Sequence, residues 1–196
     1  FVLQQALEDA LHWSETGHPI GVAVNVSATL LADHEFIETV GAILQGHALA
    51  NGRVTIEVTE SAAMDSPDRA IAALESWRSL GVGISIDDYG TGQSSLGYLQ
   101  KLPATELKID KSFVQTIVTD SRNAIMVRST VGLAHELGMK TVAEGIEDEA
   151  CLVMLAEMGC DTGQGYHIGK PMPADELFAF LQARSGEPDR PARRAA

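Results

Sequence analysis

The sequence is poor in positive charge, in cysteine and in long apolar runs. Its 196 residues contain 14 Lys and Arg against 27 Asp and Glu, which gives a formal charge of −13 at pH 7. Such an excess of negative charge argues against unaided binding to duplex nucleic acid or to an anionic membrane. If the ligand is an anion, a cation that the sequence does not encode must sit between the two.

The other absences concern location. No apolar stretch approaches the ~20 residues that span a membrane, and no basic segment followed by an apolar one marks a secretory signal. Only Cys151 and Cys160 are present, each among apolar or small residues, so both are expected to fill a core in a reducing compartment. The sequence predicts a cytoplasmic protein. A longer parent protein could be tethered to a membrane through segments upstream of this one.

What is present suffices for one domain. Apolar residues make up 45% of the sequence and charged residues 21%, which is typical of a packed globular protein. We expect residues 1–183 to form this domain and the Pro- and Arg-rich residues 184–196 to form a disordered tail. Phe1 stands within a helical pattern with no cap before it, so the chain is expected to begin partway through its domain.

Short β-branched runs alternate with helical patterns. Strands are predicted at residues 20–26, 54–59, 82–87, 106–109, 140–143 and 163–168. Helices are predicted at residues 1–14, 35–45, 67–80, 111–118, 123–137, 148–158 and 173–183, with Asp33 and Ser66 as caps and Gly81, Gly138 and Gly159 at ends. This alternation predicts an α/β fold with a parallel sheet. It fits an open doubly wound sheet, or a (β/α)8 barrel with about six of its eight strands, since a typical barrel has ~250 residues.

Nearly every predicted strand ends in a side chain that is costly to bury. These side chains are Asn25, Glu57, Asp87, Asp88, Lys108, Glu144 and Gln164. Because parallel strands bring their carboxyl ends to one face, we expect them to converge. Carboxylates in one pocket repel one another unless protons or a hard cation neutralise them, and an oxygen-rich site suits Mg²⁺ or Mn²⁺. Such a cation would also allow this acidic pocket to bind a phosphate group.

Taken singly, several of these residues have ordinary structural explanations. Asn25 suits a turn, Glu57 suits a solvated edge strand, and Lys108 suits a strand lysine that faces solvent. Asp87 and Asp88 point more strongly to function, because two adjacent acids at the end of an apolar strand precede a long polar loop that helix capping does not require. The combination of residues therefore carries the argument.

With these residues aligned, the sequence closely resembles the EAL-domain phosphodiesterases, which hydrolyse the bacterial messenger cyclic di-GMP. The resemblance runs from Phe1 to about Leu181 and rests on six stretches in order: NVSA (25–28), EVTES (57–61), DDYGTGQSSL (87–96), LKIDKSFV (107–114), VAEGIE (142–147) and GQGY (163–166). It implies a modified TIM (β/α)8 barrel with one strand reversed, and so favours the barrel over the open sheet. It further implies a homodimer and a sensory or GGDEF-type domain upstream in a parent protein.

The resemblance also implies a metal centre. Asn25, Glu57 and Asp87 match metal ligands of the family, with Asp87 shared between two ions and Asp88 serving the second. Gln164 matches a glutamine of the metal and water network. The implied cofactors are two Mg²⁺ or Mn²⁺ ions.

The remaining roles concern catalysis and the loop beside it. Lys108 matches the lysine that positions the attacking water, and Glu144 matches the carboxylate proposed to assist deprotonation of that water or to bind metal. Glu60 resembles the acid that holds the loop after Asp88. The implied reaction is hydrolysis of cyclic di-GMP to linear pGpG.

The sequence departs from the family in one respect that bears on activity. The Glu-Ala-Leu segment, whose Glu is a metal ligand and whose nearby Arg reaches a substrate phosphate, does not occur in the 196 residues. We therefore identify no substrate-binding residue, expect the segment in the parent protein, and expect little turnover from these residues alone. Two alternatives to an active phosphodiesterase are a regulatory module that binds cyclic di-GMP without turnover and, further removed, an unrelated Mg²⁺-dependent barrel lyase.

Overall fold

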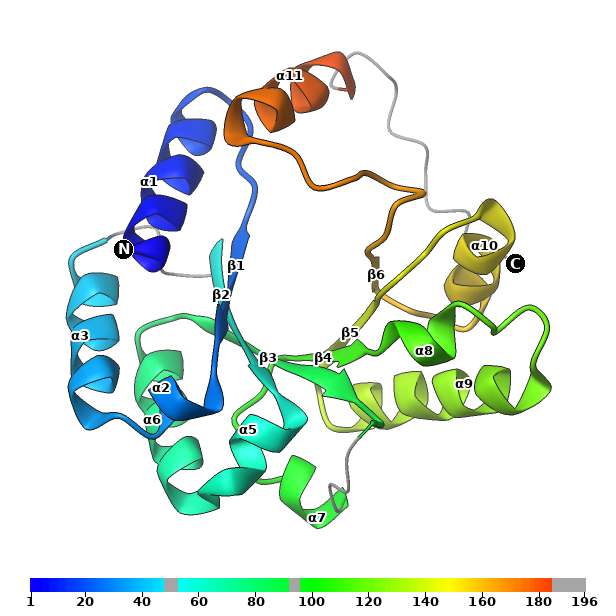
Figure 1. Ribbon diagram of the computed structural model, residues 1–196, viewed down its shortest axis with the longest axis horizontal. Helices are drawn as coiled ribbons and strands as arrows, with labels where there is room; N and C mark the ends of the chain where they lie inside the picture. The colour runs from blue at the N-terminus through cyan, green and yellow to red at the C-terminus, as the bar shows by residue number, and fades with distance from the viewer. Residues whose placement is uncertain (48–52, 92–95, 185–196) are drawn as a thin grey trace.

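The computed structural model describes residues 1–47, 53–91 and 96–184. In this part of the chain one curved sheet is built from six parallel strands in chain order: β1 (Val22–Val26), β2 (Val54–Thr59), β3 (Gly83–Tyr89), β4 (Glu106–Ile109), β5 (Lys140–Ala143) and β6 (Thr162–Gly163). The strands line the inside of the curve and the helices surround it (Figure 1). The chain thus forms part of an α/β barrel, which confirms the predicted fold class.

The helices of the described residues lie between successive strands, except for α1, which precedes β1, and α11, which follows β6. They are α1 (Val2–Glu15), α2 (Ala28–Leu31), α3 (His34–Gln45), α5 (Glu60–Asp65), α6 (Pro67–Ser79), α7 (Leu96–Leu99), α8 (Lys111–Val114), α9 (Ser121–Glu136), α10 (Glu149–Glu157) and α11 (Ala174–Arg184). Arg184, the first residue of the predicted tail, closes α11. Residues 185–196 lie outside the described part of the chain.

The two faces of the sheet differ in polarity, and β2 shows how. Val54, Ile56 and Val58 are at most 1% exposed and join the core that contains Trp77 of α6. Side chains alternate between faces along a strand, so Glu57 lies on the opposite, inner face. The apolar outer face binds the helices, and the inner face is left for polar side chains.

Several predicted helix boundaries are confirmed by hydrogen bonds and backbone angles. The Asp33 carboxylate accepts the amide N–H groups of Glu35 and Phe36 at the start of α3. Gly81, Gly138 and Gly159 follow α6, α9 and α10 with φ of 85°, 75° and 84°, the left-handed geometry that favours glycine at a helix end. The Ser66 prediction is only partly correct, because Ser66 precedes Pro67 but its side chain makes no capping hydrogen bond.

Two predicted elements are shorter than the sequence suggests. The pattern predicts a strand over residues 163–168, but β6 is confined to Thr162–Gly163. The chain then bends, and the amides of His167 and Ile168 donate to the carbonyls of Ile146 and Gly165 instead of to a strand. The helix predicted over residues 111–118 ends at Val114. In addition, α2, α5 and α7 were not predicted, because four to six residues are too few to display a helical period.

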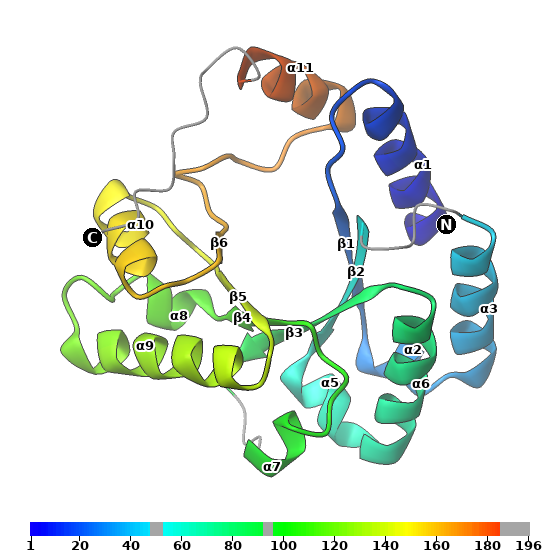
Figure 2. The same cartoon turned by 180° about the vertical axis from the view of Figure 1, so that it is seen from behind.

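The C-terminal helix reaches back to the start of the chain. In both views the segment after β6 crosses from one end of the sheet to the other and places α11 beside α1 (Figures 1 and 2). The ring of Phe178 on α11 lies 6.2 Å from that of His12 and 5.4 Å from that of His18, between ring centroids. The two ends of the curved sheet are therefore bridged by helix packing.

Two other sequence expectations concern the whole chain. Cys151 and Cys160 are free thiols; Cys151 is buried in the core, as predicted, whereas Cys160 is only partly buried and packs against that core. A search of the described residues for a helix long and apolar enough to cross a membrane found none.

The side chain of Asp161 links α9 to the start of β5 by hydrogen bonds. The Asp161 carboxylate accepts hydrogen bonds from His135 Nε2 at 2.8 Å, from Thr141 N at 2.8 Å and from Thr141 Oγ1 at 2.9 Å. Burial acts to raise the pKa of Asp161, but the bonds from His135 and Thr141 outweigh it and lower that pKa below its ordinary value of 3.8. The folded state thus favours the charged form of Asp161.

We expect Asp161→Ala to lower the free energy of unfolding by about 2 kcal/mol, because the buried amide of Thr141 loses its acceptor. The part of the wild-type contribution that depends on the charge of Asp161, which solvent screens because its side chain is 34% exposed, is present above pH 3.8 and is lost as the pH falls through the lowered folded pKa. Urea unfolding of both proteins at pH 7 and below pH 3 measures the difference. A gap between them that stays the same at both pH values would contradict this account.

Candidate functional site

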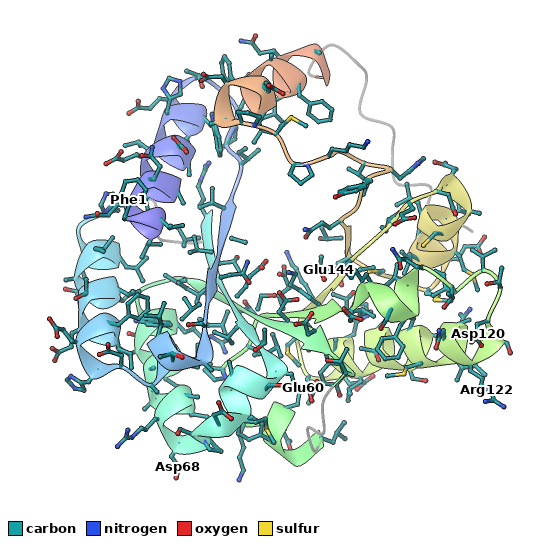
Figure 3. The ribbon with its side chains drawn as sticks, in the orientation of Figure 1. Phe1, Glu60, Asp68, Asp120, Arg122 and Glu144 are labelled. Atoms are coloured by element: carbon teal, nitrogen blue, oxygen red, sulfur yellow. The ribbon has the colours of Figure 1, made fainter. Side chains whose placement is uncertain are left out.

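The register of the sheet brings the predicted site residues onto its inner face. Asn25 is paired with Glu57, Glu57 with Ser85, and Thr59 with Asp87. Paired residues of neighbouring strands share a face, as do residues two apart on one strand. Glu144 immediately follows β5 and lies on the inside of the curve (Figure 3). The predicted convergence is observed for Glu57, Asp87, Asp88, Lys108 and Glu144, while Asn25 and Gln164 lie farther out, as described below.

Lys108 of β4 lies at the centre of this group. Its Nζ is 2.9 Å from Glu57 Oε2, 3.0 Å from Asp87 Oδ2 and 2.7 Å from Glu144 Oε1, while its own side chain is 4% exposed. Burial acts to lower the pKa of Lys108, but hydrogen bonds to Glu144 and Glu57 outweigh it, and the pKa is raised. Lys108 is thus a buried ammonium that binds three carboxylates, which excludes the alternative of a solvent-facing strand lysine.

A break in the pairing of β3 sets the direction of the two adjacent acids. The register between β3 and β4 shifts between Ile86 and Tyr89, and Asp88 there has a φ of 56°, the one positive value among non-glycine residues of the described chain. The amide of Asp88 donates to Asp87 Oδ1 at 2.9 Å. Because a left-handed φ is uncommon for residues other than glycine, the bulge marks a backbone shaped for the site.

Three carboxylates of the group lie close enough to share one cation. One oxygen each from Asp87, Asp88 and Glu144 falls within 4.8 Å of the others. Burial raises the pKa of Glu144, and burial together with the charge of Asp87 raises that of Asp88. Confinement of like charges therefore disfavours their ionised forms, and a hard cation would relieve that cost.

Glu60 holds the loop that follows these acids. It is the first residue of α5 and is buried, and its Oε2 accepts the amide N–H of Gly90 at 3.0 Å. Gly90 has a φ of 97°, and a Cβ there would lie 2.9 Å from Met126 Cε. Glu60 thus fixes the backbone two residues after Asp88, where the resemblance places its role, although residues 92–95 of the loop lie outside the described part of the chain.

Asn25 and Gln164 lie at the two edges of the sheet and are exposed. Asn25 is beside Glu57 by register. The backbone of Gln164 brackets the turn at Glu144, because its amide donates to the Ala143 carbonyl at 2.8 Å and its carbonyl accepts from Ile146 N at 3.0 Å. The structure thus places both residues at the rim, outside the ion-pair network around Lys108.

One polar residue of the inner face was missed from the sequence. Ser85 is fully buried, precedes Asp87 by two residues on the same face and pairs with Glu57, and its hydroxyl makes no hydrogen bond. A serine within an apolar strand is common in any sheet. The sequence signal that could have found it is its position two residues before Asp87, because residues two apart on a strand share a face.

A family profile described as the EAL domain matches residues 1–171. The chain belongs to the EAL domain family. The resemblance stated from the sequence is thereby confirmed.

Two similar relatives of this EAL domain have names that state an activity. It is 43% identical over 182 residues, 92% of this chain and 27% of the relative, to the "Bifunctional diguanylate cyclase/cyclic di-GMP phosphodiesterase MucR" of Pseudomonas aeruginosa. It is 39% identical over 184 residues, 93% of this chain and 24% of the relative, to the "Cyclic di-GMP phosphodiesterase NbdA" of the same organism. The chain spans about a quarter of the length of such curated relatives.

Solved structures agree with this assignment. The structure titled "PaMucR Phosphodiesterase, c-di-GMP complex" superposes with a TM-score of 0.84 at 44% identity, covering 90% of this chain and 72% of that one. The EAL domain of Mycobacterium smegmatis DcpA superposes with a TM-score of 0.85 at 34% identity, covering 93% and 82%. These EAL structures support the barrel-type architecture over the open sheet.

Proposed function

We propose that this EAL domain is a metal-dependent phosphodiesterase that hydrolyses cyclic di-GMP to linear pGpG in bacterial signalling. The observation that carries the proposal is the cluster of Asp87, Asp88 and Glu144 oxygens, joined to Glu57 through the Lys108 ammonium. The names of the relatives support the substrate, because MucR and NbdA are both called cyclic di-GMP phosphodiesterases.

The donor set fits Mg²⁺ or Mn²⁺. All the candidate ligands offer oxygen, and those of Asp87, Asp88 and Glu144 already lie near one another, as hard divalent cations require. We propose that these three residues, with Glu57, Asn25 and Gln164, hold two ions. Bound ions of this kind place positive charge on phosphoryl oxygens and favour hydroxide over water.

The other groups of the site act on the attacking water and on position. Glu144 is placed to accept the proton of that water, since its carboxylate lies on the inner face and its pKa is raised by burial. Lys108 acts on the water through its fixed positive charge, since its N–H donors bind Glu57, Asp87 and Glu144. That charge orients the water and favours its deprotonation. Glu60 contributes by holding the Gly90 backbone, and with it the direction of Asp88.

The cellular setting is also proposed. One relative is named as a diguanylate cyclase as well as a phosphodiesterase, which supports a parent protein with a sensory or GGDEF-type domain upstream of this one. We further propose that the domain acts as a homodimer in the cytoplasm and that cyclic di-GMP, not duplex nucleic acid, is its partner.

The full-length protein is expected to convert cyclic di-GMP to pGpG when Mg²⁺ or Mn²⁺ is present and to lose this activity with EDTA. Chromatography of the reaction with mass detection of the linear product measures both. Tight binding of cyclic di-GMP without product in either metal would contradict the enzymatic proposal and favour the regulatory binding module. Substantial metal-dependent hydrolysis by the 196 residues alone would contradict the need for the Glu-Ala-Leu segment.

A further inference from the structure

The three N–H donors of the Lys108 ammonium are all taken by carboxylates. An ammonium has three such donors and no acceptor, and Lys108 directs them to Glu57, Asp87 and Glu144 at 2.7–3.0 Å. The Glu57 and Lys108 side chains are 10% and 4% exposed, so solvent screens the contact between them little. Within the described residues, Lys108 is the cation that balances the charge of this group.

Two of the carboxylates that bind Lys108 are also among those that would bind a divalent ion. Asp87 and Glu144 belong both to the ion-pair network and to the group of three carboxylates within 4.8 Å. Both oxygens of Asp87 are already engaged, Oδ1 by the Asp88 amide and Oδ2 by Lys108. A metal ion that binds Asp87 must therefore share an oxygen with Lys108 or with the Asp88 amide, or displace one of them, and in either case it lies close to the Lys108 ammonium.

We propose that Lys108 is a built-in counter-ion that holds Glu57, Asp87 and Glu144 together before metal binds and competes with the metal for their oxygens. The proposal rests on the metal site of the proposed function. It assigns Lys108 an action on metal affinity and on the stability of the domain, in addition to any action on the attacking water. Positive charge a few ångströms from a divalent ion weakens its binding, and more strongly where water is largely excluded.

The test is Lys108→Met in the full-length protein, which replaces the ammonium by an uncharged side chain of similar length. Without metal the three carboxylates lose their shared cation, and we expect the unfolding temperature in EDTA to fall by about 10 °C. Mn²⁺, measured by titration calorimetry, is expected to bind the variant at least about tenfold more tightly than the wild type. Saturating Mn²⁺ should therefore raise the unfolding temperature more in the variant than in the wild type.

Two further variants keep the test decisive. Lys108→Gln removes the charge but retains hydrogen-bond donors, so it should show the same gain in Mn²⁺ affinity with a smaller loss of stability. Lys101→Met makes the same change in charge at an exposed turn after α7 and should leave both quantities unchanged. If Lys108→Met unfolds in EDTA, its recovery in Mn²⁺ supports the proposal, and failure to recover counts against it.

The outcomes separate this inference from the proposed function. Unchanged or weaker Mn²⁺ binding by both Lys108 variants, beside a wild type that binds Mn²⁺ and forms pGpG, overturns the counter-ion proposal alone. A wild type that binds no Mn²⁺ overturns the metal site and the inference together.

Discussion

Glu144→Gln is expected to lower the turnover of cyclic di-GMP by about 10³-fold while most of the binding affinity is retained. The amide has the shape of the carboxylate and can still accept from Lys108, which lies 2.7 Å from Glu144 Oε1. It cannot accept a proton from water at neutral pH. The loss should therefore fall on the chemical step and leave the position of the substrate largely unchanged.

Single-turnover kinetics of the full-length protein with cyclic di-GMP in Mn²⁺, together with calorimetry of ligand binding, would measure this split. Glu147→Gln is the matched control, because Glu147 lies only three residues further on and is exposed. Among the described residues, its carboxylate accepts a hydrogen bond from Gln115 alone. It removes the same charge and should leave turnover within about twofold of the wild type. Unchanged turnover in Glu144→Gln would contradict the role assigned to Glu144.

Gly165→Ala is expected to destabilise the domain by about 3 kcal/mol and to disturb the site. A Cβ at this position would lie 2.2 Å from the carbonyl oxygen of Ile146 and 2.3 Å from its amide nitrogen. Those backbone groups bond to His167 N and to the Gln164 carbonyl, both at 3.0 Å. Relief of the clash must push the segment after β6 away from the turn that follows Glu144.

The prediction can be checked by urea unfolding and by Mn²⁺ binding, both of which should be weakened. Gly132→Ala is the control: Gly132 lies within α9, and a Cβ there meets nothing within 4 Å. Alanine is a better helix former than glycine, so this control should gain about 0.5–1 kcal/mol. Equal unfolding free energies for the two variants would contradict the close packing of Gly165 against Ile146.

Much of the fold and of the candidate site could be predicted from the sequence, because the signals are local. β2, β4 and β5 have the predicted boundaries, since each is a short apolar run that ends where polar residues begin. The acids lie near the carboxyl ends of their strands, with Glu57 in β2, Asp87 and Asp88 in β3, and Glu144 directly after β5. Parallel pairing then brings them to one face without further information. Asn25, Glu57 and Asp87 thus converge for a reason visible in their positions.

The features that were missed depend on tertiary contacts. β6 ends at Gly163 because the next residues bond to the turn around Ile146, a partner far away in the sequence. Lys108 could be assigned a role by resemblance, but its three simultaneous ion pairs depend on how β2, β3 and β5 curve around β4. The positive φ of Asp88 likewise arises from the register shift against β4.

The central claim is that the carboxylates at the strand ends hold divalent metal for hydrolysis of cyclic di-GMP. Crystals of the full-length protein grown with Mn²⁺ and cyclic di-GMP test it most directly, through the anomalous scattering of manganese. We predict a peak about 2.1 Å from oxygens of Asp87, with Asp88 or Glu144 completing the coordination and the ligand phosphate beside it. Bound cyclic di-GMP with no manganese at Asp87, and Lys108 still holding Glu57, Asp87 and Glu144, would contradict the claim.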